Sequence, residues 1–563
     1  MSLLKASCFV RTWRSVVIRT ASSNGPQANT DPSSTPEQKL MKKWGTDNVR
    51  IAQQLEEGTV KPFNTIPGPR SFSFLGTKPL FWKIVGKYDK DQHMETYYKF
   101  YKEFGEIVRE DVHPKHPLVH IYNPADMQTM FIYEGTYPMR YSHMVLEKYR
   151  LEKPEVYASG GILPSNGPAW YALRKKFQKS LQDYREVEKY VGRVEEITDE
   201  FLEARIQPGI IEDCSQEVAR LFMELTSLVA FDERFHAFSE AEMRPDSRSS
   251  RLMGSASVIN CSIMKTNLNH ILWRLFPQLS KAWRDLVVAH AYVEEVALEQ
   301  IAKKMAYIKE IDATRPENRA PTSTLESYLR LKDTDIRDIT GMIVDLLLGG
   351  SDTITSSMSY LLHNLSRHPA VQEKIYEECL RIQPDDNGRL PQDVAQKATY
   401  TSQVIRESLR INPVAIGIGR VLPVDVVMSG YHVPKFTHIV SQNQVACRLP
   451  QYFDDPLEFR PERWERRRYI RGEDHLQEER LVSEKCLSIP FSHGSRVCIA
   501  KKVAELDMIV LLLKLCRRYT MRWAGAPKVG MRTVLVHQPD TPIRIEFTER
   551  KSLADSSTPS PRT

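Results

Sequence analysis

PFSHGSRVCIAKKVAE, at residues 490–505, is the most informative stretch of this sequence. Cys498 ends a loop that carries Gly494 and Arg496, and an apolar run with helical spacing follows at once. A cysteine in that position lies at the positive end of a helix macrodipole, where free N–H groups favour the thiolate over the thiol. A thiolate is a strong metal ligand, although a lone cysteine before a helix is by itself more typical of a buried core residue.

The complete string F-x-x-G-x-R-x-C, which ends at Cys498, resembles the haem-thiolate loop of the cytochrome P450 family. An axial thiolate on haem iron favours cleavage of the O–O bond. The resemblance implies that Cys498 is the axial ligand of a haem b, and that Arg496 pairs with a haem propionate. Ala500 stands where the family usually has glycine; alanine is the better helix former, and its one methyl group is compatible with this position.

Residues 335–367 form a long, mostly apolar pattern that predicts a helix, interrupted by LLGGSDTITSS. The two glycines each cost roughly 0.5–1 kcal/mol relative to alanine in a helix, so we expect a ligand to approach the backbone closely there. Asp352 and Thr353 follow the glycines, and an acid beside an alcohol can deliver protons to dioxygen. G-G-x-D-T resembles the oxygen-binding motif of the family, which implies that Asp352 and Thr353 are catalytic.

Two further motifs concern haem binding. Trp170 and Arg174 lie four residues apart on a predicted helix and therefore share a face, although such a pair is also typical of a surface stack. In the family, a W-x-x-x-R pair of this kind holds a haem propionate. Arg420 matches a second propionate arginine of the family, so the resemblance assigns Trp170, Arg174, Arg420 and Arg496 to the haem.

Glu407 and Arg410 form an E-x-x-R pair on a predicted helix. An exposed pair at this spacing is worth only roughly 0.2–0.5 kcal/mol. In the family the pair is buried and is joined by the arginine of a later P-E-R-W segment, which is Arg463 here. We therefore expect these three residues to be a fold element rather than catalytic groups.

Basic residues near the cysteine loop predict a docking site for an electron-donating protein. Lys501 and Lys502 match paired basic residues of mitochondrial P450s, and Arg406 resembles another docking position, although Ser402 replaces a usual lysine. Complementary charge would steer an acidic ferredoxin to this patch. The ferredoxin would itself receive electrons from NADPH through a ferredoxin reductase. A solvated charged face is the alternative interpretation.

The composition is typical of an intracellular, organellar protein. Eight cysteines without a C-x-x-C pair argue against a zinc site or a disulfide framework and suit a reducing compartment. No run reaches the roughly 18 apolar residues that a spanning helix needs. The net charge is +7, and four of these charges lie in the first thirty residues, so the remaining +3 does not support nucleic-acid binding.

The first thirty residues are basic, contain serine, lack acids and are amphipathic, which is the pattern of a mitochondrial transit peptide, with a disordered basic tail as the alternative. We expect a transit peptide at 1–30, a linker at 31–60, a P450 domain at 61–548 and a disordered tail at 549–563. The fold implied is mainly α-helical with a small β-rich lobe. Irregular residues 141–168 would contact substrate, and 465–484 reads as a solvated insertion.

Residues 268–279 are rich in apolar side chains and are read either as core or as a loop that dips into the inner mitochondrial membrane on its matrix side. We expect a peripheral monomer.

Three phrases, at 419–434, 442–464 and 498–502, look most like the arthropod mitochondrial ecdysteroid 22-hydroxylases, which implies hydroxylation of a steroid side chain. The alternatives are a mitochondrial hydroxylase of another sterol or a xenobiotic, and a haem-thiolate gas sensor. A sensor needs no proton relay, so Asp352 and Thr353 argue against it.

Overall fold

The computed structural model describes residues 36–82, 86–113, 116–268, 270–314, 320–385, 388–465 and 487–550. The chain divides into two compact units, Met1–Arg50 and Ile51–Thr563. Helix α2 (Pro36–Glu56) begins in the first unit, and the other described elements belong to the second.

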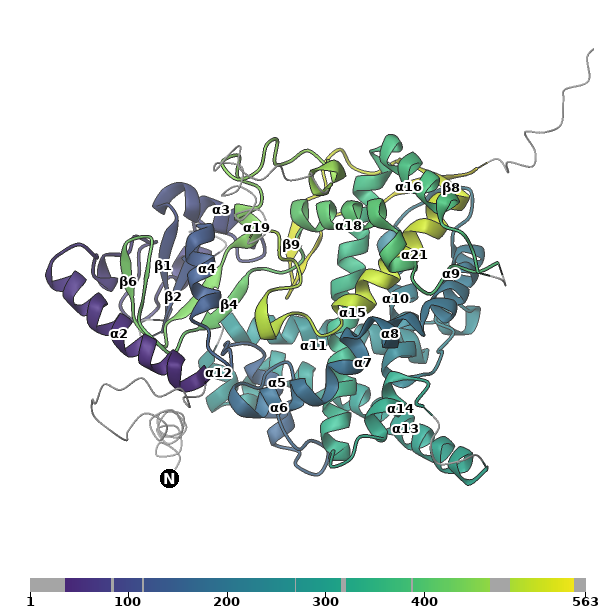
Figure 1. Ribbon diagram of the computed structural model, residues 1–563, viewed down its shortest axis with the longest axis horizontal. Coiled ribbons are helices and arrows are strands. Elements are labelled where there is room, and N and C mark those ends of the chain that lie inside the picture. Colours follow the sequence, from purple (N-terminus) through teal and green to yellow (C-terminus); the bar gives the residue numbers. More distant parts are fainter. Residues whose placement is uncertain are drawn as a thin grey trace, which may run out of the picture. The chain divides into compact units, whose positions relative to one another are not determined.

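Helices make up most of the second unit (Figure 1). In chain order they are α3 (His93–Phe104), α4 (Pro124–Ile132), α5 (Met144–Leu151), α6 (Gly167–Phe177), α7 (Lys179–Gln182), α8 (Tyr184–Glu188), α9 (Val191–Arg205), α10 (Cys214–Phe231), α11 (Arg248–Leu268), α12 (His270–Leu275), α13 (Lys281–Thr314), α14 (Thr324–Leu329), α15 (Ile336–Ser366), α16 (Pro369–Arg381), α17 (Val394–Lys397), α18 (Thr399–Ile411), α19 (Asn443–Ala446) and α21 (Lys501–Arg518). Short 3₁₀ helices are η1 (Phe63–Thr65), η2 (Lys78–Phe81), η3 (Glu240–Met243), η4 (Pro277–Leu279), η5 (Pro461–Trp464) and η6 (Gly494–Arg496).

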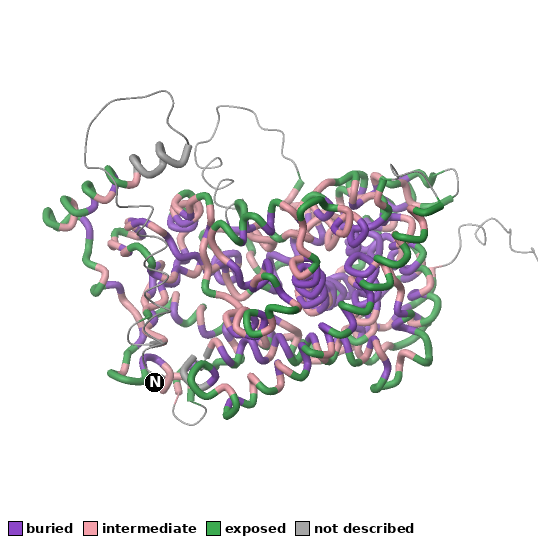
Figure 2. Tube along the Cα trace, turned by 90° about the horizontal axis from the view of Figure 1, so that it is seen from below, coloured by how far each residue is buried: buried purple, intermediate pink, exposed green. Residues whose placement is uncertain are grey.

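Helix α15 is the centre of the helical part. Its first turn is capped by Asp335, whose side chain accepts a hydrogen bond from the backbone N–H of Arg337. Its apolar residues are buried nearly all round, as expected of a helix inside a core, and it packs against α10, α11, α13 and α18. Buried residues accordingly concentrate within the helical part of the trace (Figure 2).

Most strands lie at the other end of the second unit, and some lie among the helices (Figure 1). They are β1 (Ile107–His113), β2 (His116–Ile121), β3 (Gly209–Ile211), β4 (Ile418–Val421), β5 (Val426–Met428), β6 (Tyr431–Val433), β7 (His438–Ser441), β8 (Tyr519–Trp523), β9 (Met531–Thr533), β10 (His537–Pro539) and β11 (Ile545–Glu549). The largest sheet has the order β1-β2-β7-β4, in which only β2 and β7 are parallel. Three smaller sheets have the orders β5-β6, β10-β9 and β3-β11-β8, and the last of these lies against the helices.

The expected fold class, mainly α-helical with a small β-rich lobe, is confirmed. Two local expectations are corrected. Residues 36–56 of the expected linker form α2, because Pro36 at the first turn precedes a run of good helix formers. The segment 141–168 contains α5, whose apolar residues are buried, so it is not irregular throughout. The expected transit peptide, residues 466–484 of the expected insertion and residues 551–563 of the tail lie outside the described residues.

Candidate active site

The cysteine loop lies between η6 and the start of α21. The Cys498 N–H donates to the Phe491 carbonyl (2.8 Å), and Gln182 Nε2 donates to the Cys498 carbonyl (3.3 Å). Cys498 has accessible surface, yet burial by the surrounding protein raises the pKa of its thiol. One side of Cys498 is exposed and the rest is surrounded by protein, which accounts for both the accessible surface and the raised pKa. The N–H of Ala500 and the charge of Arg174 act in the opposite direction and favour the thiolate, as expected from the helix terminus.

Four arginine side chains converge beside this loop: Arg140, Arg174, Arg420 and Arg496. Burial and the neighbouring positive charges lower the pKa of Arg496 to about 8 and that of Arg140 to about 10. The positive charge of Arg174 reaches the Cys498 sulfur electrostatically. The structure therefore brings the three predicted propionate arginines together and adds a fourth, Arg140.

Arg496 is held rigidly. Its guanidinium carbon lies 3.9 Å from the ring centroid of Trp170, which is itself buried on α6. Its Nε donates to the Pro138 carbonyl (2.9 Å), and its Nη2 donates to the Ser165 carbonyl and to Asn166 Oδ1 (both 2.8 Å). Trp170 thus contributes by stacking on an arginine, in addition to sharing a face with Arg174.

The cluster fits an anionic group. Arg496 Nη1 and Arg140 Nε are buried and have no hydrogen-bond partner among the described residues. Unpaired buried guanidinium nitrogens are costly, so they are expected to face a ligand. Several positive charges near one another require compensation, which the two carboxylates of a haem would supply.

Glu134 is the carboxylate of this cluster. It forms an ion pair with Arg420 Nε, and burial raises its pKa while the arginine charges lower it. A Cβ at Gly494 would lie 2.5 Å from Glu134 Oε1, and Gly494 has a φ of +72°. The glycine of the cysteine loop is therefore required both for the turn and for the position of Glu134.

Asp352 and Thr353 lie in the middle of α15. Asn260 Nδ2 on α11 donates to Asp352 Oδ2 (2.9 Å), and burial raises the pKa of Asp352. Thr353 Oγ1 donates to the carbonyl of Gly349 one turn earlier (2.6 Å). Both side chains of the pair are thus half-buried.

The two glycines of α15 have different surroundings. A Cβ at Gly350 would lie 2.9 Å from Thr226 Cγ2 on α10, whereas one at Gly349 would meet no atom of the described residues within 4 Å. The expectation that a ligand explains both glycines is therefore wrong for Gly350, which is needed for close packing of α10 on α15. Gly349 borders open space, and a ligand can approach it.

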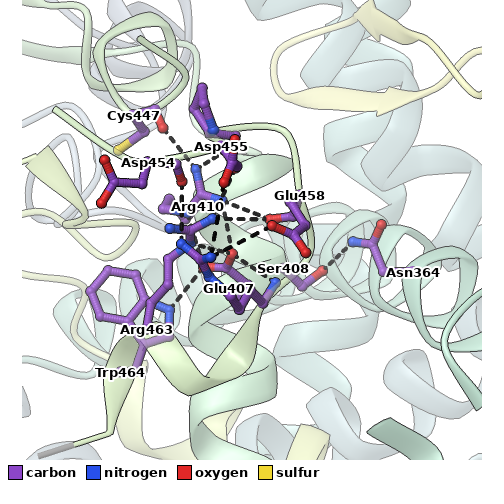
Figure 3. A network of polar contacts seen from close by, with 12 residues as sticks. Asn364, Glu407, Ser408, Arg410, Cys447, Asp454, Asp455, Glu458, Arg463 and Trp464 are labelled. Atoms are coloured by element: carbon purple, nitrogen blue, oxygen red, sulfur yellow. Dashed lines mark hydrogen bonds and ion pairs between the residues drawn. The ribbon is translucent and has the colours of Figure 1, made fainter. Parts of the chain in front are cut away.

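The E-x-x-R pair is fully buried and joins three segments (Figure 3). Arg410 donates to both Glu407 oxygens (2.9 and 2.8 Å), and Arg463 Nε donates to Glu407 Oε1 (3.0 Å). Arg410 Nη1 also donates to the Cys447 and Pro456 carbonyls (2.8 and 2.7 Å). The structure therefore assembles the three predicted residues into one network that fastens residues 447–464 to α18.

The predicted docking residues differ in the contacts that they make with the rest of the chain. Lys502 lies 3.4 Å from the ring centroid of Tyr184, and Lys501 lies 3.7 Å from Glu505. The Arg406 guanidinium stacks on the Trp464 ring at 3.7 Å, so its side chain supports the buried network. Lys502 also lines a surface groove of about 710 Å³ between α6, α7, α8 and α21.

Sequence reasoning assigned no role to Arg140, Glu134 or Asn260. The first two begin and end the phrase EGTYPMR at 134–140, and its charged residues were the available signal. Asn260 lies in a polar stretch of α11 that gave no signal.

The family model described as Cytochrome P450 matches residues 73–547, which is most of the chain. The chain belongs to the cytochrome P450 family, a class of haem-thiolate monooxygenases, and it is an enzyme of that class.

Among similar proteins, "Cytochrome P450 302a1, mitochondrial" of Drosophila melanogaster is 36% identical over 87% of this chain and 96% of its own length. "Ecdysone 20-monooxygenase" of the same organism is 28% identical over 86% of this chain and 88% of its own length. "Probable cytochrome P450 301a1, mitochondrial", also from this fly, is 28% identical over 89% of both chains. The expected membership among mitochondrial P450s is confirmed.

Proposed function

We propose that this monooxygenase hydroxylates the side chain of a steroid, and that its reaction is ecdysteroid 22-hydroxylation in the synthesis of moulting hormone. The buried arginine cluster beside Cys498 carries the assignment of the site, because its unpartnered nitrogens suit haem propionates. The substrate rests on likeness: the phrases at 419–434 and 442–464 resemble the ecdysteroid 22-hydroxylase Disembodied, and one relative is named for ecdysone.

The proposed reaction needs residues that bind the haem and residues that handle protons. Cys498 would ligate the iron of haem b, and Arg140, Arg174, Arg420 and Arg496 would hold the propionates. The haem supplies the activation of dioxygen when it is bound. Asp352 would hold a proton on its carboxyl group. Thr353 donates its own hydroxyl hydrogen to the Gly349 carbonyl, which leaves its oxygen lone pairs able to accept a hydrogen bond from solvent or from the protonated Asp352.

Electrons would come from NADPH through a ferredoxin reductase and an acidic ferredoxin. The groove beside α21 supports this partner, because Gln182 in its wall bonds the Cys498 carbonyl and its lining has more basic than acidic side chains. The basic residues are Lys175, Lys179, Arg185 and Lys502, and the acidic ones are Asp183 and Glu188. With Arg406 stacked on Trp464, we assign docking chiefly to Lys501, Lys502 and the groove.

The proposed location is the matrix face of the inner mitochondrial membrane. Across the described ranges, the helices are too short or too polar to cross a bilayer. Trp273 is buried and bonds the Thr266 carbonyl, so it belongs to the core. Leu275, Phe276 and Leu279 are 57, 56 and 68% exposed, and they support peripheral contact with lipid and entry of a lipophilic substrate from it.

The test is turnover of a 22-deoxy ecdysteroid by the purified, haem-loaded protein with a mitochondrial ferredoxin and its reductase. The expected product is the 22-hydroxylated ecdysteroid, identified by mass and nuclear magnetic resonance. A product hydroxylated at another carbon would support the monooxygenase and contradict the regiochemistry. Absence of product with a normal carbon-monoxide spectrum would favour another sterol or a xenobiotic.

The Cys498→Ala variant is the control for the haem ligand in this experiment. Its carbon-monoxide spectrum should lose the thiolate-type band. Retention of that band would contradict the assignment of Cys498.

A further inference from the structure

The Asp352 carboxyl group bonds a neutral side chain from another helix. Asn260 is 6% exposed, and its Nδ2 lies 2.9 Å from Asp352 Oδ2, across the contact between α11 and α15. Asn260 is buried and Asp352 is half-buried, so the amide is not a surface group that happens to reach a carboxylate. The bond joins residues that are 92 positions apart in the chain.

We infer that Asn260 is a positioning residue for Asp352, and that its amide directs the exchangeable proton of this carboxyl group to Oδ1. The inference rests on the proposed role of Asp352 in handling protons. An amide N–H that donates to Oδ2 uses one lone pair of that oxygen and makes it less basic, so a proton is carried preferentially on the other oxygen. An unrestrained carboxyl group could present either oxygen.

The neutrality of the donor matters for proton transfer. Burial raises the pKa of Asp352, while the bond from Asn260 lowers it. A lysine or arginine in this position would favour the carboxylate strongly and hinder its protonation. An amide stabilises the charged form only moderately, so it leaves the protonated form of the carboxyl group more accessible than a cation would.

The surroundings of Asp352 are otherwise modestly charged. Cys261, the next residue on α11, lies within electrostatic range of Asp352, and Lys265 and Arg532 lie within range of Cys261. On the α10 side, the neighbour of α15 at Gly350 is the neutral Thr226. The Asn260 bond is therefore the direct contact that sets the orientation of the carboxyl group.

The bond also places the proton-handling pair under the control of α11. That helix continues through α12 into the exposed apolar residues Leu275, Phe276 and Leu279. A displacement of α11 changes the distance between Asn260 and Asp352, whereas Thr353 keeps its bond within α15. Of the two residues, Asp352 is therefore the one whose hydrogen bonding depends on the position of α11.

The test compares Asn260→Leu with Asn267→Leu in the haem-loaded protein. Asn267 lies two turns further along α11, so the control makes the same substitution on the same helix. Infrared difference spectra follow the protonated carboxyl band of Asp352 across pH, with the band assigned by its loss in Asp352→Asn. Asn260→Ser, whose side chain is too short to reach Asp352, serves if the leucine variant does not fold.

In Asn260→Leu the protonated band should persist to higher pH, because a donor that favours the carboxylate has been removed. Product formed per NADPH should fall about tenfold, since a hydrogen bond to a charged group is lost. Asn267→Leu should match the unmodified protein in both measurements. An unchanged titration in Asn260→Leu or Asn260→Ser would overturn the inference. A shifted titration with unchanged coupling would support the positioning and instead contradict the proton relay under the proposed function.

Discussion

Replacing Glu407 by glutamine should loosen residues 447–464 from α18. The Glu407 side chain is fully buried and accepts five hydrogen bonds, which come from Arg410 (two), Arg463, Trp464 and the backbone of Arg460 at 2.8–3.1 Å. Glutamine offers one acceptor oxygen and turns an amide N–H₂ toward arginine donors. Two guanidinium groups then lose their counter-charge.

The cost can be worked from this geometry. Breaking a buried ion pair from one side costs about 3–5 kcal/mol, because an uncompensated buried charge remains. Most of that cost falls on the segment whose carbonyls Arg410 holds, at Cys447, Pro456 and Glu458. We therefore expect local opening of 447–464 before global unfolding.

Hydrogen exchange measured by mass spectrometry is the appropriate assay. Amides in 447–464 should exchange about a hundredfold or more faster in Glu407→Gln, the factor that 3 kcal/mol implies. Glu458→Gln makes the same chemical change in the same segment at an exposed carboxylate, and its effect should be small. Equal exchange in the two variants would refute the reasoning, since it would mean that the buried network does not hold the segment.

Four further predictions test the site and the fold. Thr353→Ala should divert NADPH electrons to peroxide, and unchanged coupling would contradict the relay. Arg496→Gln should weaken haem retention by about ten- to a hundredfold, because charge-assisted bonds are lost; haem release after dilution measures this. Lys502→Ala should raise the KM for ferredoxin several-fold, most strongly at low salt, while Lys309→Ala on α13 should not. The pKa of the buried His93 is lowered from 6.5 to about 4, so protonation favours the unfolded state. Its contribution to stability is present above pH 6.5 and is lost as the pH falls toward 4. Other buried histidines with lowered pKa values add to the loss, so urea unfolding at pH 7 and pH 5 should show a loss about 2 kcal/mol smaller in His93→Gln than in the unmodified protein. An equal loss in the two proteins would exclude a contribution of His93.

The sequence by itself determined the family and the order of the motifs, and it predicted most of the candidate site residues. The spacing within F-x-x-G-x-R-x-C, G-G-x-D-T and E-x-x-R fixes neighbouring residues on one loop or one helical face, because local geometry depends on short separations. Such spacing places Cys498 before α21 and Asp352 beside Thr353 without knowledge of the fold. The amphipathic and apolar runs likewise predicted α15 and α21.

The tertiary structure decided which of these residues meet and which partners each one contacts. Arg420 and Glu134 are 286 residues apart, and Arg496 and Asn166 are 330 apart, so no local rule pairs them. The same folding stacks Arg406 on Trp464, explains Gly350 by the approach of Thr226, and brings Asn260 to Asp352. Contacts of this kind depend on how buried helices and loops pack in three dimensions, and a linear pattern carries no record of that packing.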